Sequence, residues 1–351
     1  MGTFGRKLRN KVLLMALGGD LYRRLTGDDN TSRQMALFNM RYELTMGLPR
    51  LTKNTGGGGQ FIVTLTSYGK RIATTAPKAI WSIFTGAVLP DRVILWLAHD
   101  DKDKITPSLE KLQAHGLEIR FGDDLKSYKK LIPALREFPD DILITADDDT
   151  YYPRDWLSRL KAGYAQNPTK IWCHRAHIIT LDEQRQIRSY NRWQGCAALP
   201  NTPSGLVFPT GVGGVLYPPH SLHPLITAEK EFLTLAPTAD DVWSWAMAKL
   251  QGTEYGVIEN GYGFGGKMFD LQNESGEKPL WQINTGEQNA NDRQIAAVLA
   301  KFPEVKAAVV NSGGIRANRA VYNFIIRVAS CFIINRQKRK AFRLKFRDCP
   351  R

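Results

Sequence analysis

Three consecutive carboxylates, at Asp147, Asp148 and Asp149, follow the short apolar run 142–146. Neighbouring carboxylates repel one another and raise each other's pKa unless a cation compensates them. In an extended chain Asp147 and Asp149 point to one side and Asp148 to the other. This alternation favours Asp147 and Asp149 as ligands of Mg²⁺ or Mn²⁺, with the rest of the coordination shell left to water and phosphate oxygens. A solvated acidic turn is the other interpretation that the triplet allows.

A second acidic pair, Asp240 and Asp241, begins a predicted helix over 240–250. Negative charge is favourable at the start of a helix, because the unpaired backbone N–H groups there carry partial positive charge. One of the two acids could cap the helix while the other points into a site.

Alternating strand and helix signals lead up to the triplet. Apolar runs bounded by turn residues predict strands at 61–65, 93–98, 117–121 and 142–146, and helix-length segments lie between them at 76–84, 108–115 and 128–138. This order predicts an α/β fold with a Rossmann-like, mostly parallel sheet and helices on both faces. Ligands bind at the carboxyl ends of the strands in such sheets, which is where the triplet falls.

The pattern changes after the triplet. Strands are predicted at 171–180 and 187–193, a Gly- and Pro-rich stretch at 200–224, a polar loop at 281–292 and a helix from about Asp292. The four glycines at 56–59 predict a boundary. The predicted organisation is a basic N-terminal arm and linker at 1–59, a domain at 60–312 divided at 153/154, and a basic amphipathic tail at 313–351.

The formal net charge of +14 over 351 residues indicates a polyanionic partner. Much of the basic charge lies in the two terminal segments, and the tail interleaves it with Phe, Ile and Leu. Such a segment suits a helix on an anionic membrane surface, although a tail helix packed on the domain is also compatible. A nucleic-acid reader would carry its basic charge on one face of the domain, so no specific nucleic acid is expected.

Four cysteines without paired metal-ligand spacing predict a reducing compartment. The N-terminus has no convincing apolar core and cleavage site of a secretory signal. We therefore expect a cytoplasmic protein that is peripheral on the inner face of the cell membrane.

With these features in order, residues 60–310 resemble bacterial family 2 type glycosyltransferases, which have the GT-A fold and use nucleotide sugars to make surface polysaccharide or lipopolysaccharide. The resemblance rests on four elements in order: the run 65–68 after the first strand, Asp100 and Asp101 after the second, the triplet after the fourth, and the later pair at 240–241. It implies that 60–153 is a nucleotide-binding half and 154–312 an acceptor half.

The resemblance also implies roles in binding a nucleotide-diphosphate sugar, with a UDP-sugar favoured. The implied donor-binding residues are Thr66, Ser67, Tyr68, Arg71, Asp100, Asp101, Asp148 and Lys129, the last of these slightly preferred to Lys130. Asp147 and Asp149 would hold the metal, which stabilises the departing diphosphate. His177 could add to the metal site, although a hydrogen-bonded structural histidine is the alternative.

An inverting transfer needs a base that takes the proton of the acceptor hydroxyl, and the resemblance implies Asp241, or else Asp240, for this role. The implied acceptor is a glycan or a lipid-linked glycan. A nucleotidyltransferase is the main enzymatic alternative, although residues 65–71 lack its glycine-rich phosphate loop. A non-enzymatic nucleic-acid-binding protein is the alternative that the basic charge leaves open.

Overall fold

The computed structural model describes residues 48–51, 59–196, 198–258, 269–271, 275–276, 284 and 289–312. Nearly all of the predicted arm, the whole predicted tail and most of the loop 281–292 lie outside these residues.

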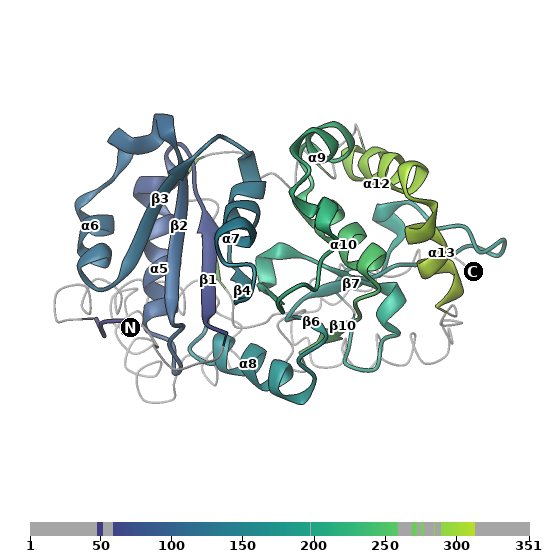
Figure 1. Ribbon diagram of the computed structural model, residues 1–351, viewed down its shortest axis with the longest axis horizontal. Coiled ribbons are helices and arrows are strands. Elements are labelled where there is room, and N and C mark those ends of the chain that lie inside the picture. Colours follow the sequence, from purple (N-terminus) through teal and green to yellow (C-terminus); the bar gives the residue numbers. More distant parts are fainter. Residues whose placement is uncertain are drawn as a thin grey trace, which may run out of the picture.

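The described chain is built on a central sheet with the strand order β10-β6-β9-β4-β1-β2-β3. Its strands are β1 (Phe61–Thr66), β2 (Arg92–Ala98), β3 (Leu117–Gly122), β4 (Ile142–Thr145), β6 (Ile171–Cys173), β9 (Val215–Tyr217) and β10 (Tyr255–Val257). β9 runs antiparallel to β4 and β6, and the other paired neighbours are parallel. The predicted mostly parallel α/β sheet is confirmed. Figure 1 shows its strands from β3 and β2 at the left of the view to β6 and β10 at the right.

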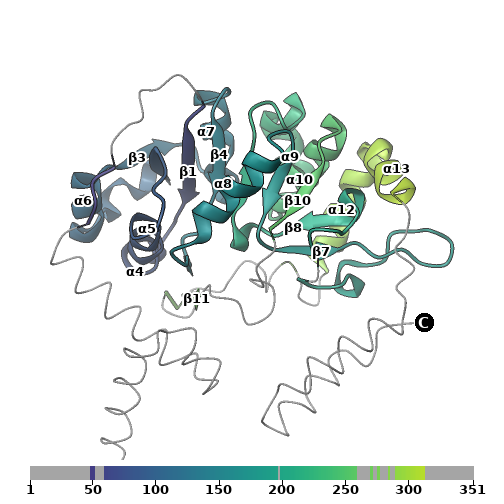
Figure 2. The ribbon, with the colours of Figure 1, turned by 90° about the horizontal axis from the view of Figure 1, so that it is seen from below.

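Helices cover both faces of the sheet because its strands are apolar on both sides. Val63 points to the face covered by α5 (Ala76–Phe84), α6 (Pro107–Ala114) and α8 (Trp156–Gln166). Ile62 points to the opposite face, which packs with the other helices: α7 (Ile132–Glu137), α9 (Glu229–Leu235), α10 (Asp240–Gln251), α12 (Ala290–Lys301) and α13 (Pro303–Asn311). Figure 2 shows the same arrangement from below.

Short elements lie around this framework. Two small antiparallel sheets pair β5 (Thr150–Tyr151) with β11 (Phe269–Asp270) and β7 (Ala176–Ile178) with β8 (Val207–Pro209). The short helix α4 (Arg71–Thr74) follows β1, and the 3-10 turns are η1 (His99–Lys104), η2 (Lys126–Lys130), η3 (Tyr190–Arg192), η4 (Ser204–Leu206), η5 (Gly211–Gly213) and η6 (Pro224–Thr227).

The structure differs from the sequence prediction in three places. The predicted helix 128–138 is split between η2 and α7, because Leu131 leaves the helical region at φ −123° and α7 restarts with Pro133 in its first turn. The predicted strand 171–180 is two strands that belong to different sheets. The predicted strand 187–193 instead contains the turn η3.

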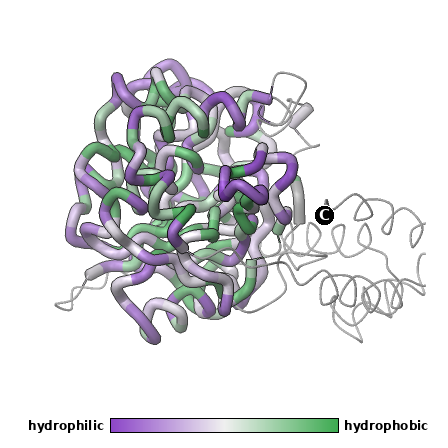
Figure 3. The backbone as a smooth tube through the Cα atoms, turned by 90° about the vertical axis from the view of Figure 1, so that its right-hand side faces the viewer, coloured by the Kyte–Doolittle hydropathy of each residue, from purple (hydrophilic) through white to green (hydrophobic). Residues whose placement is uncertain are grey.

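Hydrophobic segments gather in the middle of the molecule and hydrophilic ones at its rim, as the tube coloured by hydropathy shows (Figure 3). Fully buried aromatic side chains from several helices fill this interior, including Trp81, Trp156, Trp243 and Trp245. None of the helices in the described part of the chain has the length and apolar character needed to cross a membrane.

Candidate functional site

The carboxyl ends of β1 and β4 meet where the strand order changes direction, since β2 and β3 lie on one side of β1 and β4 on the other. Ligands enter open α/β sheets at such a reversal. Ser67 follows β1 and Asp148 follows β4, and Ser67 Oγ donates a 2.6 Å hydrogen bond to Asp148 Oδ2. Two of the segments singled out in the sequence are therefore in direct contact at this edge.

Arg71, in α4, is the counter-ion of two acids of the triplet. Its Nη1 lies 3.1 Å from Asp148 Oδ1 and 2.8 Å from Asp149 Oδ2, and the exposed fraction of each of these side chains is 6–7%. Burial lowers the pKa of Arg71, but Asp148 and Asp149 outweigh it and hold that pKa above its ordinary value. Burial raises the pKa of Asp148, and Arg71 opposes this effect. The guanidinium thus allows two neighbouring carboxylates to be buried together.

The first acid of the triplet turns away from the other two. Asp148 and Asp149 share Arg71, whereas Asp147 Oδ1 lies 3.0 Å from Lys130 Nζ. Strand alternation had predicted that Asp147 and Asp149 would point the same way. That orientation is corrected here, because β4 ends at Thr145 and the acids lie in the turn that follows, where a period of two no longer holds.

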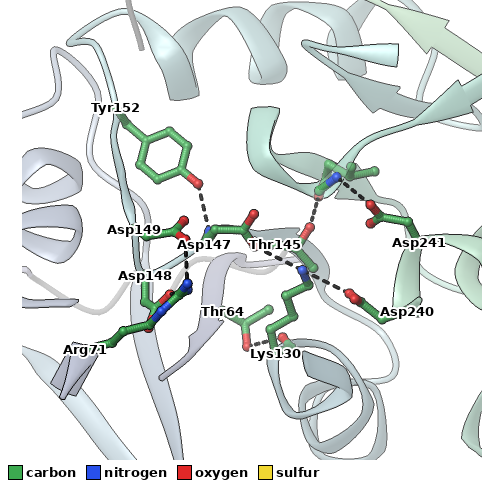
Figure 4. A network of polar contacts seen from close by, with 12 residues as sticks. Thr64, Arg71, Lys130, Thr145, Asp147, Asp148, Asp149, Tyr152, Asp240 and Asp241 are labelled. Carbon is green, nitrogen blue, oxygen red and sulfur yellow. Dashed lines mark hydrogen bonds and ion pairs between the residues drawn. The ribbon is translucent and has the colours of Figure 1, made fainter. Parts of the chain in front are cut away.

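Lys130 joins the triplet to the acidic start of α10. Its Nζ lies 3.0 Å from Asp147 Oδ1 and 2.9 Å from Asp240 Oδ2, and 10% of its side chain is exposed (Figure 4). Its backbone carbonyl accepts a 2.7 Å hydrogen bond from Thr64 Oγ1 in β1. Burial lowers the pKa of Lys130, but Asp147, Asp240 and Asp241 outweigh it and keep the ammonium charged.

Asp241 lies beside this lysine and is held by a backbone amide. Gly211 N–H, in η5, donates a 3.1 Å hydrogen bond to Asp241 Oδ2. A Cβ atom at Gly211 would come within 3.0 Å of both Asp241 Oδ1 and Lys130 Nζ, so a larger residue here would displace these side chains by a few tenths of an ångström. Burial, and then the charge of Asp240, raise the pKa of Asp241 from 3.8 to about 7, while Lys130 lowers it. A carboxyl group with this pKa can accept a proton near neutral pH.

Lys129, which the sequence favoured over Lys130, faces a different acid. Its ammonium pairs with Asp124, and only 3% of its side chain is exposed. The two lysines occupy successive positions of η2 and diverge, so Lys130 lies among the acids, and binding of the donor diphosphate by Lys129 stays a prediction.

The remaining predicted donor residues lie near the same sheet edge. Thr66 Oγ1 donates to Trp96 O in β2 at 2.8 Å, whereas Tyr68 is 45% exposed and lies over Arg71, with its ring centroid 5.2 Å from the guanidinium carbon. Asp100 and Asp101 belong to η1 after β2; Asp101 is buried and pairs with Lys104, and Asp100 is exposed. These positions follow β1 and β2, as the sequence predicted.

Both ring nitrogens of His177 have protein partners. Its Nδ1 accepts a 2.8 Å hydrogen bond from Cys196 N–H, and its Nε2 lies 3.0 Å from Tyr190 Oη. Burial lowers the pKa of His177 to about 4, and Arg175 lowers it further. This environment matches the structural alternative given above for His177, and metal binding through this ring remains an untested prediction.

Lys130 and Gly211 are the parts of the site that the sequence did not assign. Lys130 was visible only as one of two adjacent lysines, and its selection depends on which way η2 turns. Gly211 lay in a glycine-rich stretch without a marker of its contact with Asp241. Tyr152 is a further member, because its hydroxyl accepts a 2.7 Å hydrogen bond from Asp147 N–H and so helps to fix the turn.

The donor atoms of this site suit a hard divalent cation. Four of its five carboxyl groups, on residues 147–149 and 240, pair with two cations, Arg71 and Lys130, and the fifth, on Asp241, accepts a hydrogen bond from Gly211 N–H. No group of three or more acid, His or Cys side chains in the described part of the chain is arranged so that it could hold a metal ion. Mg²⁺ typically takes one or two carboxylates and completes its shell with water and substrate phosphates, and the residues present fit that mode.

No family model and no curated protein sequence matches the chain. Among solved structures, it is similar to Staphylococcus aureus TarS 1–349 in complex with UDP, with a TM-score of 0.38, 10% identity, and coverage of 57% of this chain and 58% of that one. It is also similar to CMP:2-keto-3-deoxy-manno-octonic acid synthetase complexed with CTP, with a TM-score of 0.35, 12% identity, and coverage of 57% of this chain and 89% of that one. A third similar structure is HddC from Yersinia pseudotuberculosis, with a TM-score of 0.29, 10% identity, and coverage of 46% of this chain and 77% of that one. The chain spans 58% of the TarS structure, and the fold assignment rests on the strand order itself.

Proposed function

We propose that the protein is a metal-dependent, inverting glycosyltransferase that moves a sugar from a nucleotide-diphosphate donor to a glycan or lipid-linked acceptor in surface polysaccharide synthesis. The observation that carries the proposal is the meeting of two acidic groups from distant parts of the chain. Asp147, which follows β4, and Asp240, which begins α10, share Lys130 at the carboxyl edge of the sheet. The acids after β4 suit a donor diphosphate with its metal, and the acids at the start of α10 suit the acceptor hydroxyl.

Asp241 is the proposed base. Its pKa of about 7 makes the carboxylate available near neutral pH, and Gly211 N–H fixes one of its oxygens. In the proposed step Asp241 takes the proton from the acceptor hydroxyl while the hydroxyl oxygen attacks the anomeric carbon. The bond from that carbon to the diphosphate oxygen breaks on the opposite face, which inverts the configuration.

Asp147 and Asp149 are the proposed ligands of Mg²⁺ or Mn²⁺. A bound divalent cation would stabilise the negative charge that develops on the departing diphosphate. The two carboxylates have different cation partners, Lys130 for Asp147 and Arg71 for Asp149, so a shared metal would have to draw them together from these positions. An added divalent cation would favour the approach of a diphosphate to this acidic site, because it would offset part of the repulsion between like charges.

Ser67, Tyr68 and Asp101 are proposed to bind the nucleotide, because they follow β1 and β2 at the same edge. A UDP-sugar is the favoured donor. For the whole protein we propose a cytoplasmic location on the inner face of the cell membrane, with the basic tail in contact with anionic lipid.

Calorimetry on the full chain tests this proposal with UDP, GDP, CDP and dTDP, each with and without Mn²⁺. We expect metal-dependent binding of one diphosphate that is at least about tenfold weaker in Asp149→Ala. Lys78→Ala, a half-buried lysine of α5 remote in sequence from the acids, is the matched control and should bind like the wild type.

The chemistry is then tested with the matching nucleotide sugar and with a nucleoside triphosphate plus a sugar 1-phosphate. Release of the diphosphate from the nucleotide sugar supports the transferase. Release of pyrophosphate from the triphosphate would support a nucleotidyltransferase instead. If none of the four diphosphates binds, the proposal is contradicted. If the sugar is transferred with retained configuration, the role of Asp241 is contradicted.

A further inference from the structure

Arg175 lies against the turn that holds the candidate base. Its backbone carbonyl accepts a 3.0 Å hydrogen bond from Thr210 N–H, and the next residue, Gly211, donates its own N–H to Asp241. On the other side of this turn, a Cβ atom at Gly213 would come within 2.7 Å of Arg175 Cβ. Arg175 is therefore fixed to the same structural unit, η5, that fixes Asp241.

The charge of Arg175 has no carboxylate partner among the described residues. Its Nε donates a 2.8 Å hydrogen bond to Cys196 Sγ, and a thiol sulfur is a weak acceptor. The described arginines that have carboxylate partners include Arg71, Arg92, Arg120, Arg136 and Arg159. Arg175 is half-buried, so its charge is partly desolvated without being neutralised. A planar guanidinium in this situation suits an oxyanion that it can bind through two parallel N–H groups.

Tyr190 is connected to Arg175 through two residues: Tyr190 Oη lies 3.0 Å from His177 Nε2, Cys196 N–H donates to His177 Nδ1, and Cys196 Sγ accepts from Arg175 Nε. Tyr190 lies in the electrostatic field of both charged groups: burial and then Asp241 raise the pKa of its hydroxyl, and Arg175 opposes them. The Tyr190 ring packs against Trp193 at 5.0 Å and against His177 at 5.4 Å between ring centroids. Trp193 is buried, whereas Tyr190 is half-buried, so Tyr190 is the ring of this pair that a ligand could contact.

We propose that Arg175 and Tyr190 form an acceptor subsite and that the acceptor carries an anionic group, a phosphate or a carboxylate, which Arg175 binds. The anion would anchor the acceptor on the η5 side of the site, with its reactive hydroxyl toward Asp241. This inference rests on the proposed function, since it assigns the acceptor of that reaction. It adds an anionic group on the acceptor and a residue that binds it, neither of which the resemblance specified.

The test uses three matched probes: p-nitrophenyl glucoside, p-nitrophenyl glucuronide and p-nitrophenyl glucoside 6-phosphate. Their binding to the full chain is measured by calorimetry or ligand-observed NMR, with and without saturating UDP and Mn²⁺. We expect one or both anionic glycosides to bind at least about tenfold more tightly than the neutral one. The glucuronide and the 6-phosphate distinguish a carboxylate from a phosphate.

Arg175→Met should remove this preference, and Arg175→Lys should keep part of it, because a lysine retains the charge without the planar fork. The lysine variant also guards against a folding defect in the methionine variant, and the melting temperatures of both are measured. Arg185→Gln is the matched control, since Arg185 donates to the carbonyl of Val310 and should leave the preference unchanged.

Equal binding of neutral and anionic glycosides by the wild type, no binding of either anionic glycoside, or a preference that survives in Arg175→Met would each overturn the inference. UDP affinity is measured in the same samples and should not change in the Arg175 variants. Failure of UDP to bind the wild type would count against the proposed function, whereas the glycoside measurements without UDP would still decide the role of Arg175.

Discussion

Removal of the Lys130 ammonium should affect both acids that it contacts, Asp147 and Asp240. Without its ammonium, Asp147 and Asp240 would face one another with no shared cation. We expect Lys130→Met to lower turnover at least about 100-fold and to destabilise the fold by about 2 kcal/mol, because breaking a largely buried ion pair leaves an uncompensated charge. Steady-state kinetics and thermal unfolding check these values, and Lys130→Met with Asp240→Asn should recover part of the stability.

Lys129→Met is the control for this experiment. The two lysines are adjacent and similarly buried, but Lys129 pairs with Asp124, whose side chain is 64% exposed. Turnover of this variant should stay within about threefold of the wild type, since the acids near β4 keep their cations. A comparable loss of turnover in both variants would argue that η2, and not the Lys130 ammonium, is responsible.

The pH dependence of turnover should report Asp241. The base must be ionised, and its pKa is about 7, so turnover should rise with pH and level off above about 7. Asp241→Asn should lower turnover by about 10²–10⁴-fold, which is the usual contribution of a general base. A pH–rate profile on the wild type checks the first expectation, and a rate that is flat between pH 5 and 8 would exclude Asp241 as the titrating base.

Ionisation of the Asp241 carboxyl group should lower the stability of the fold, although it raises turnover. Its pKa is raised from 3.8 to about 7 in the folded state, so the folded chain binds the proton more tightly than the unfolded chain does. The stabilisation that the bound proton provides is present at low pH and is lost as the pH rises through about 7. We therefore expect Asp241→Asn to melt at a higher temperature than the wild type at pH 8, with the difference shrinking toward pH 4.

At the scale of elements, regular periodicity was predictable and departures from it were not. The strands β1 to β4 and the helix α5 followed from apolar runs between turn residues. The strand β9 was only one alternative for its segment, because its three residues lie in a Gly- and Pro-rich stretch and the strand is recognised by its pairing with β4. The orientation of Asp147 was missed for a related reason, since the turn after β4 ends the alternation on which the prediction depended.

The turn η5 gives a prediction at this scale. Gly211→Ala would place a methyl group within 3.0 Å of Lys130 Nζ and of Asp241 Oδ1. We expect turnover to fall at least about tenfold with a destabilisation of about 1–3 kcal/mol, because the ion network and the Gly211 N–H contact must shift. Gly122→Ala at the end of β3 is the matched control, since a Cβ there meets no atom within 4 Å.

At the scale of the whole molecule, we expect membrane contact to depend on the basic tail. This expectation comes from the sequence of 313–351, which lies outside the described residues. Deleting residues 315–351 should weaken co-sedimentation with phosphatidylglycerol vesicles by at least about tenfold, because each basic residue near an anionic surface contributes about 1 kcal/mol. Binding of UDP by the truncated protein is the control, and undiminished sedimentation would contradict membrane contact through the tail.

The antiparallel strand β9 also has a consequence for how the chain is made. Thr145 in β4 pairs with Val215, 70 residues later, so β4 has an open edge until the ribosome has delivered β9. A buried, apolar strand with unpaired backbone groups is a template for joining another chain. The N-terminal half expressed alone would therefore be an aggregation hazard, and the slow, long-range closure by β9 would set the period during which a nascent chain needs protection by a chaperone.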